Sequence, residues 1–151
     1  MTTLVLTEGL LTPSCSKSHI TYSFNVPKES SRLDIHFSYD PKKLDHREKS
    51  KELICEGICN FVDCGQERYI NEWESFLPVQ NLLTLSVDDG REFRGCVHRQ
   101  SPEQHLYIAG DSASPGLIPG TIPPGQWKVT ISVHAVVTDV CRYKLHVMGA
   151  E

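Results

Sequence analysis

The sequence predicts a mostly β protein: a two-sheet antiparallel β-sandwich, jelly-roll-like, with one inserted amphipathic helix near residues 45–60. Apolar and polar side chains alternate over long stretches, which is typical of strands that have one buried face. Turn signals separate about seven or eight such stretches. Only one segment has clear helical spacing, whereas a parallel sheet would need a crossover helix for most strand pairs. The 151 residues fit a single domain, residues 1–151.

The longest alternating stretch is residues 126–137, where Trp127, Val129 and Ile131 lie on the apolar side and Lys128 on the polar side. This period of two predicts a long strand that begins at Trp127, with that indole in the core. Alternation resumes over residues 141–147 after a short polar connection. Two such stretches around a short polar connection predict a β-hairpin.

Shorter alternating stretches predict the other strands. They cover residues 19–26, 32–39, 83–87, 93–98 and 105–109, and Leu4 and Leu6 indicate a short strand near the start. Turns are expected at residues 27–31 and at Asp88-Asp89-Gly90. Residues 112–125 hold four prolines and three glycines, so this segment is expected to be a rigid loop that leads into the longest strand.

One segment breaks the alternation. Between Asp45 and Asn60, charged residues surround apolar positions such as Leu53, Ile54 and Ile58, which fall at helical spacing. We expect an amphipathic helix here that lies across an end or an edge of the sandwich. Gly57 weakens this helix by about 1 kcal/mol relative to alanine. A second short helical piece is expected near residues 71–77.

Composition and charge narrow the function classes. Hydrophobic residues make up 39% and charged residues 23% of the chain, and the formal net charge is −4. This charge offers no attraction to nucleic acid or to an anionic membrane surface. The sequence shows no signal-peptide pattern and no apolar stretch of the ~18 residues that span a bilayer. We therefore expect a soluble cytoplasmic protein whose six cysteines are reduced.

The sequence contains no complete catalytic motif. It has no Gly-x-Ser-x-Gly, no P-loop, no dinucleotide fingerprint and no HExxH. Cys96 and His98 would point the same way on a strand, but nothing nearby orients the histidine as a base. A non-enzyme is therefore favoured over an enzyme, and no cofactor is expected.

Two groups of residues are candidates for metal binding. Cys55, Cys59 and Cys64 are close in sequence, but the spacing lacks the second pair of ligands of a structural zinc site, so small apolar fillers are the favoured alternative. Four histidines lie on the polar faces of predicted strands and would converge only if those strands were neighbours; the alternative is ordinary solvated side chains. They are His19, His36, His134 and His146.

Positive charge is concentrated in residues 91–99. Arg91, Arg94, His98 and Arg99 form a candidate anion-binding or ligand-binding patch. The favoured alternative is a solvated strand face that nearby acidic side chains balance. Trp73 lies in an irregular region and is compatible with either a core or a binding role.

Three segments together resemble a known module. They are residues 81–89 (NLLTLSVDD), 93–95 (FRG) and 114–129 (SPGLIPGTIPPGQWKV). They are similar to the N-terminal β-sandwich that precedes the catalytic domain in PHP-type, carbaryl-hydrolase-like metal-dependent phosphoesterases. The resemblance spans about residues 18–148. In that family the metal-binding residues lie in a separate downstream domain, and this chain stops where that domain would begin, so no catalytic residue is carried over.

The resemblance implies a non-catalytic accessory or binding module beside a hydrolase, either an accessory half or a stand-alone relative. The expected partners are a second copy of the chain in a homodimer or a partner hydrolase domain, and a small ligand is the other expected target. Two alternatives stay open at this point. One is a metal-dependent phosphoesterase or enzyme subunit, and the other is a carbohydrate-binding module.

Overall fold

The computed structural model describes residues 1–151, which form eight strands and a helical insertion. The strands are β1 (Thr2–Leu11), β2 (Ser18–Val26), β3 (Arg32–Asp40), β4 (Leu82–Asp88), β5 (Phe93–Val97), β6 (Glu103–Ala109), β7 (Gly125–Ala135) and β8 (Cys141–Ala150). A short 3-10 turn, η1 (Pro13–Cys15), links β1 to β2. Each predicted strand is present, and the one expected at Leu4 and Leu6 is a full ten-residue strand.

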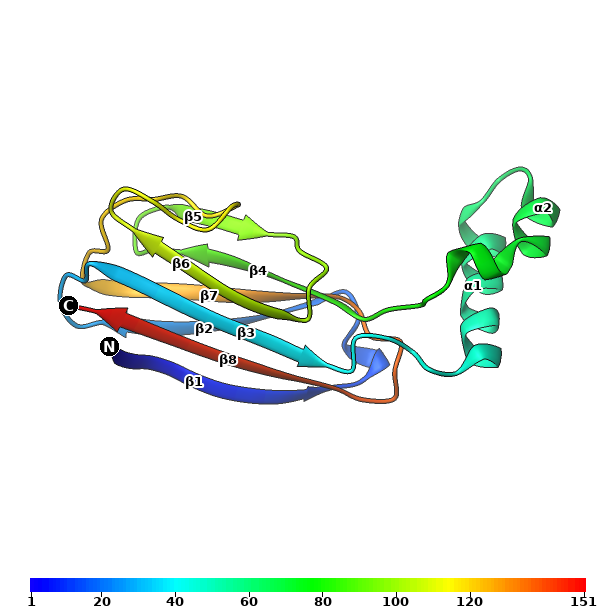
Figure 1. The fold of residues 1–151 in the computed structure, drawn as a ribbon, viewed down its shortest axis with the longest axis horizontal. Helices are drawn as coiled ribbons and strands as arrows, with labels where there is room; N and C mark the ends of the chain where they lie inside the picture. The colour runs from blue at the N-terminus through cyan, green and yellow to red at the C-terminus, as the bar shows by residue number, and fades with distance from the viewer.

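The strands form two four-stranded antiparallel sheets that pack face to face (Figure 1). One sheet has the order β1-β8-β3-β6 and the other has the order β2-β7-β4-β5. This arrangement is an eight-stranded jelly roll and confirms the predicted fold class. Consecutive strands lie in opposite sheets, with β4 and β5 as the exception.

The predicted hairpin between β7 and β8 is wrong. β7 pairs with β2 and β4, whereas β8 pairs with β1 and β3 in the opposite sheet. The connection between them therefore crosses the sandwich. Alternation predicts which face of a strand is buried but not which sheet the strand joins, because both sheets turn their apolar faces to the same core.

The core lies between the sheets and comprises 24 buried residues, all of them from the sandwich strands and their loops. Trp127 is fully buried, as predicted, and its indole nitrogen donates to the carbonyl of Pro123 at 3.0 Å. That bond satisfies the one polar group that the large ring brings into the core.

The Pro/Gly loop (residues 112–124) covers the sandwich beside β5 and β6. The Cys96 amide donates to the Gly116 carbonyl and the Gly120 amide to the Ala109 carbonyl, so the loop is bonded to one strand of each sheet. Leu117 of this loop is almost fully buried and belongs to the core. The loop therefore protects two edge strands that would otherwise offer unpaired backbone groups.

The insertion between β3 and β4 is a helical projection. It consists of α1 (Arg47–Phe61), α2 (Gln66–Asn71) and the 3-10 turn η2 (Trp73–Phe76), and it extends away from one end of the sandwich (Figure 1). The helix was expected to lie across the sandwich; instead α1 packs mainly against α2 and η2. The physical reason is that the strands and the Pro/Gly loop already close the sandwich core. None of the three helical elements is of the length and apolarity that crossing a membrane requires.

A neck of two paired segments joins the projection to the sandwich. Lys43 forms an antiparallel bridge with Gln80, and the Leu44 amide donates to the Val79 carbonyl. Asn81 is fully buried at the base of the neck. Its side chain donates to the carbonyl of Pro41 and the hydroxyl of Thr138, each at 2.8 Å, and accepts from the Val137 amide at 2.7 Å. The neck is thus bonded to the loop that follows β7.

Candidate functional site

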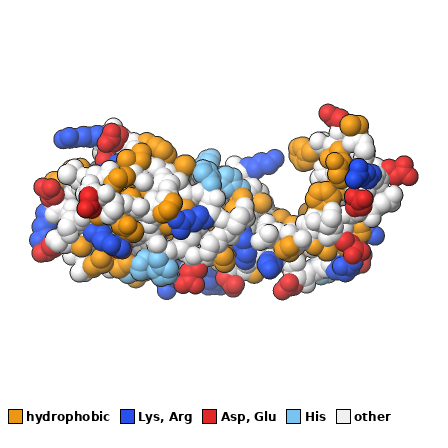
Figure 2. Space-filling view, turned by 45° about the horizontal axis from the view of Figure 1, so that its top comes forward, with side chains coloured by type: hydrophobic (Ala, Val, Ile, Leu, Met, Phe, Trp, Pro, Cys, Tyr) orange, Lys and Arg blue, Asp and Glu red, His pale blue; other side chains and the backbone are white.

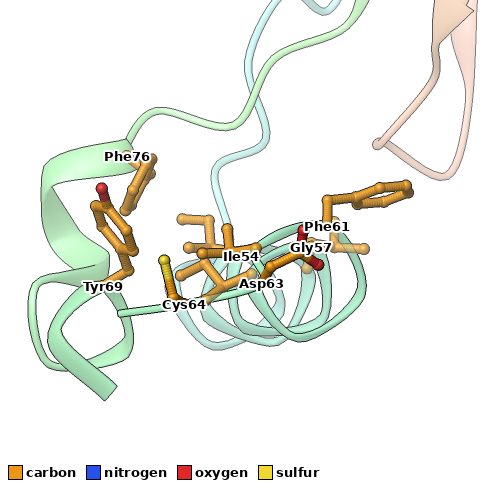
Figure 3. Close-up of a pocket in the computed structure, with 10 residues that line it drawn as sticks. Ile54, Gly57, Phe61, Asp63, Cys64, Tyr69 and Phe76 are labelled. Carbon is orange, nitrogen blue, oxygen red and sulfur yellow. The ribbon is translucent and has the colours of Figure 1, made fainter. Parts of the chain in front are cut away.

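A concave, mostly apolar surface lies on the helical projection. It is an open groove of about 710 Å³ between α1 on one side and α2 with η2 on the other (Figure 3). Eight of its ten lining residues are hydrophobic. The ten are Leu53, Ile54, Gly57, Ile58, Phe61, Val62, Asp63, Cys64, Tyr69 and Phe76. We call this surface the apolar groove.

The sequence builds the apolar groove from one face of α1. Leu53, Ile54 and Ile58 recur at helical spacing and form its floor, and Gly57 keeps that floor open because it has no side chain. A Cβ added at Gly57 would meet no atom within 4 Å. The glycine that weakens the helix therefore widens the groove.

The turn after α1 places the opposite wall. Gly65 has φ of +75°, a left-handed conformation that glycine adopts without strain, and it turns the chain back into α2. The Gln66 amide group donates to the Val62 carbonyl at 2.6 Å and caps the end of α1. Tyr69 and Phe76 then stand across the groove, with ring centroids 6.1 Å apart in an edge-on arrangement.

Aromatic side chains at the groove are open to solvent. Phe61 is 82% exposed, Phe76 is 46% exposed and Tyr69 is 40% exposed. Figure 2 shows hydrophobic side chains gathered on the projecting part of the molecule. Single exposed apolar residues are ordinary, whereas a contiguous group of them around a groove is typical of interaction surfaces.

The C-terminal end of α1 gives the apolar groove a negative end. Asp63 lines the groove, is exposed and takes part in none of the ion pairs of the molecule. The last turn of α1 contains no basic residue, so nothing offsets the negative end of the helix dipole there. The ion pairs of the projection, Arg47 with Glu74, Arg68 with Glu72 and Lys49 with Asp139 of the sandwich, engage three of its cations elsewhere. The groove is therefore apolar along its length and favours a positive charge at one end.

The three cysteines with candidate metal roles lie on the projection. Cys55 is half-buried on α1, Cys59 is exposed one turn later, and Cys64 lines the apolar groove. All are free thiols. No group of three or more His, Cys, Asp or Glu side chains in the molecule is arranged to hold a metal ion, so the structure does not bring these cysteines together into such a site.

The residues of the candidate anion-binding patch do not lie together in the structure. Arg94 points inward, is 3% exposed, and forms a 3.0 Å ion pair with Asp89 that is buried on both sides. Arg94 also donates to the carbonyls of Thr121 and Ile118 and lies over the Trp127 ring. Because Arg94 is buried, it is not part of a surface patch. The sequence does not predict this burial, since arginine side chains on strands are usually exposed.

The remaining members of that patch lie at opposite ends of β5. Arg91 is exposed in the turn before the strand, and its amide donates to Asp89. His98 and Arg99 follow the strand, where the His98 ring lies 6.2 Å from the ring of His134. Binding of a ligand by these three side chains stays a prediction, but they do not form one cluster with Arg94.

The histidines on the polar strand faces divide into separate groups. His36 and His146, two of the four candidates, lie beside each other on neighbouring strands and are joined by His105. His19 lies on the other sheet and bonds to Ser132. Burial and the two neighbouring imidazoles lower the pKa of His36 below its ordinary value of 6.5. His105 was missed because its strand pairing is not visible in the sequence.

Comparisons with known proteins do not place the chain in a family. No protein-family model matches it, and no curated protein matches it in sequence. A solved structure with some likeness is the pre-peptidase C-terminal domain of collagenase from Bacillus anthracis, with 10% identity and a TM-score of 0.47 over 98% of this chain and 91% of that chain. A likeness this distant carries no argument about function.

Proposed function

We propose that this protein is a non-catalytic binding module that holds another protein in the apolar groove of its helical projection. The observation that supports this proposal most directly is the open groove of about 710 Å³ with Phe61, Tyr69 and Phe76 exposed around it. The jelly roll serves as the rigid base, and the neck carries the groove away from it.

The shape of the groove favours a helical segment as the occupant. Amphipathic helices dock in grooves of this kind by placing apolar side chains one turn apart along an apolar floor. Exposed aromatic side chains such as Phe61 and Phe76 are typical anchors of protein interfaces. We therefore assign the groove to an amphipathic segment of a partner protein.

The charge at the groove favours a particular partner. A lysine or arginine at the end of the partner segment would face Asp63 and the C-terminal end of α1. A second copy of this chain fits less well, because each chain carries a formal net charge of −4 and its groove is lined by one charged residue, the acidic Asp63, so it offers no basic group to a partner groove. The partner is thus a different protein with a basic flank beside its apolar face.

The sequence resemblance to the β-sandwich domains that precede phosphoesterase domains suggests a class of protein for this partner. We propose a metal-dependent hydrolase domain on a separate chain as the partner class, with this protein as its accessory module. The support is the run of motifs from residues 81 to 129, which is a matter of sequence likeness alone.

Two synthetic peptides test the proposal. Both form amphipathic helices with the same leucine face; one has lysines and the other has glutamates at its end. Fluorescence anisotropy with the full chain should show binding of the lysine peptide, with an affinity that falls as salt rises, and at least ten-fold weaker binding of the glutamate peptide. Equal affinity for both peptides, or binding of neither, contradicts the proposal.

Matched variants locate the binding. Gly57→Leu fills the floor of the groove and should abolish peptide binding, while a leucine is also a better helix former than glycine. Asn60→Leu places the same side chain on α1 outside the groove and should leave binding unchanged. Light scattering of the free chain gives a further check: a dimer that Gly57→Leu dissociates would mean that a second copy is the occupant and would overturn the assignment of a different partner.

A further inference from the structure

The outer surface of the sheet that contains β3 carries three histidines side by side. His36 on β3 lies directly opposite His105 on β6 and directly opposite His146 on β8. The ring centroid of His36 is 4.2 Å from that of His105 and 6.3 Å from that of His146. The three rings line a shallow pocket of about 220 Å³ together with Glu103 and Lys144. We call this group the histidine row.

The rings at the two ends of the row have hydrogen-bond partners that orient them. Nε2 of His146 lies 2.9 Å from the hydroxyl of Thr3, and Nε2 of His105 lies 3.3 Å from a carboxylate oxygen of Glu103. Such bonds hold an imidazole in place and leave its other nitrogen free to act as a ligand. The central ring, His36, is half-buried and forms none of the side-chain hydrogen bonds of the molecule.

Neutral imidazoles held on rigid strands are ligands for borderline divalent metals such as Zn²⁺, Ni²⁺ and Cu²⁺. The histidine row crosses β8, β3 and the edge strand β6, and paired backbones on both sides fix the position of β3. Glu103 adds a negative charge beside His105 that favours a cation, and Lys144 lies on the far side next to His146. The electrostatic preference is therefore for a cation near His105 rather than near His146.

We propose that His36 and His105 bind one divalent transition-metal ion at the surface of the sandwich. These two rings are the closest pair in the row, at 4.2 Å between centroids. Because no three His, Cys, Asp or Glu side chains are arranged to hold a metal ion, the protein supplies two nitrogen ligands and water completes the coordination. The site is independent of the apolar groove, which lies on the helical projection at one end of the molecule.

The test uses the full chain after removal of metal with a chelator. Calorimetry with ZnCl₂ should give one ion per chain, and MgCl₂, a hard cation that prefers oxygen ligands, should give no binding. In NMR spectra the ring signals of His36 and His105 should shift on addition of ZnCl₂. His36→Gln and His105→Gln should each weaken zinc binding at least ten-fold, with unchanged circular dichroism as evidence that the sandwich is folded.

Other histidines provide the controls. His134 lies 6.2 Å from His98 in a separate pair, so His134→Gln should leave zinc binding unchanged. His146→Gln should reduce the affinity less than three-fold if two ligands hold the ion. The proposal is overturned by zinc binding that survives His36→Gln, by a loss in His134→Gln, by a loss in His146→Gln equal to that in His105→Gln, or by no binding at millimolar ZnCl₂.

Discussion

Two glycines in contrasting surroundings should respond in opposite ways to substitution by alanine. Gly57 lies within α1 with open space where a Cβ would be, so Gly57→Ala should raise the stability of the helix by up to about 1 kcal/mol. Gly95 has φ of +113°, and a Cβ there would overlap the Gly116 carbonyl in the Pro/Gly loop. Gly95→Ala should therefore destabilise the sandwich, and urea unfolding followed by circular dichroism measures both changes. A stabilising Gly95→Ala would show that the loop is not held against β5.

The buried ion pair between Asp89 and Arg94 is the second residue-scale feature. Their side chains are 5% and 3% exposed. Removing one partner leaves the other charge buried and unpaired. Asp89→Asn should therefore lower the free energy of unfolding by about 3–5 kcal/mol. Urea unfolding at pH 7 measures this cost, and Glu92→Gln in the same turn, where the side chain is exposed, is the control that should change little.

The same pair makes stability depend on pH. Burial opposes ionisation of Asp89, but the amides of Arg91 and Glu92 and the Arg94 guanidinium outweigh it and lower the pKa of Asp89 below its ordinary value of 3.8. Because the folded pKa is the lower one, the contribution is complete above the unfolded value and is lost as the pH falls through the folded pKa. Between pH 5 and acid pH, the wild type should thus lose more stability than Asp89→Asn. Parallel pH profiles would contradict this assignment.

For single residues, the sequence predicts the burial of side chains that follow the two-residue period of a strand. It does not predict the burial or the contacts of side chains that depart from this period. Trp127 and its neighbours at every second position are buried as the alternation indicates. Arg94 is buried although it is charged, because a carboxylate from the preceding turn and two loop carbonyls satisfy it. His105 joins His36 through strand pairing that no local pattern reveals.

At the scale of elements, the helical projection behaves as an addition to a complete sandwich. The neck segments are already paired as a bridge between Lys43 and Gln80. Replacing residues 44–79 with the two-residue turn Asn-Gly should close the neck as a hairpin and leave the jelly roll folded. The near-ultraviolet signal of Trp127 and the thermal midpoint should stay close to those of the full chain, while peptide binding is lost. A shortened chain that fails to fold would show that the projection is part of the folding unit.

The neck itself depends on Asn81. This one buried side chain donates to the Pro41 carbonyl and the Thr138 hydroxyl and accepts from the Val137 and Thr138 amides. Asn81→Leu removes these hydrogen bonds and leaves buried backbone groups unpaired, which costs about 1–3 kcal/mol for each unsatisfied group. Urea unfolding should show this loss, and hydrogen exchange should show weaker protection of the Val137 and Leu44 amides. Protection equal to that of the wild type would mean that the neck is held by other contacts.

The sequence predicts every strand and α1 but does not predict α2 (Gln66–Asn71), and it predicts only part of the arrangement of these elements. Helical spacing of Leu53, Ile54 and Ile58 predicts α1, and it equally suits a helix that packs on a sheet and one that packs on other helices. Whether the sandwich needs a covering helix depends on how well its core is closed, which follows from the pairing of distant strands and the position of the Pro/Gly loop. The candidate groove could not be found from the sequence for this reason, although the exposed Phe61 belongs to the same stripe.

At the scale of the whole molecule, the two parts should unfold separately. The sandwich has a core of 24 buried residues, whereas Ser50, Ile58 and Trp73 are the buried residues of the helical elements. The small buried surface of the projection gives it little stability of its own. In urea, the helical circular dichroism signal should therefore fall at a lower urea concentration than the fluorescence of Trp127. A Trp73→Phe variant is used to measure the fluorescence of Trp127 alone. The lysine peptide that occupies the apolar groove should move the first transition to higher urea and leave the second unchanged, because ligand binding stabilises the unit that forms the site. A single transition by both probes would show that sandwich and projection form one cooperative unit.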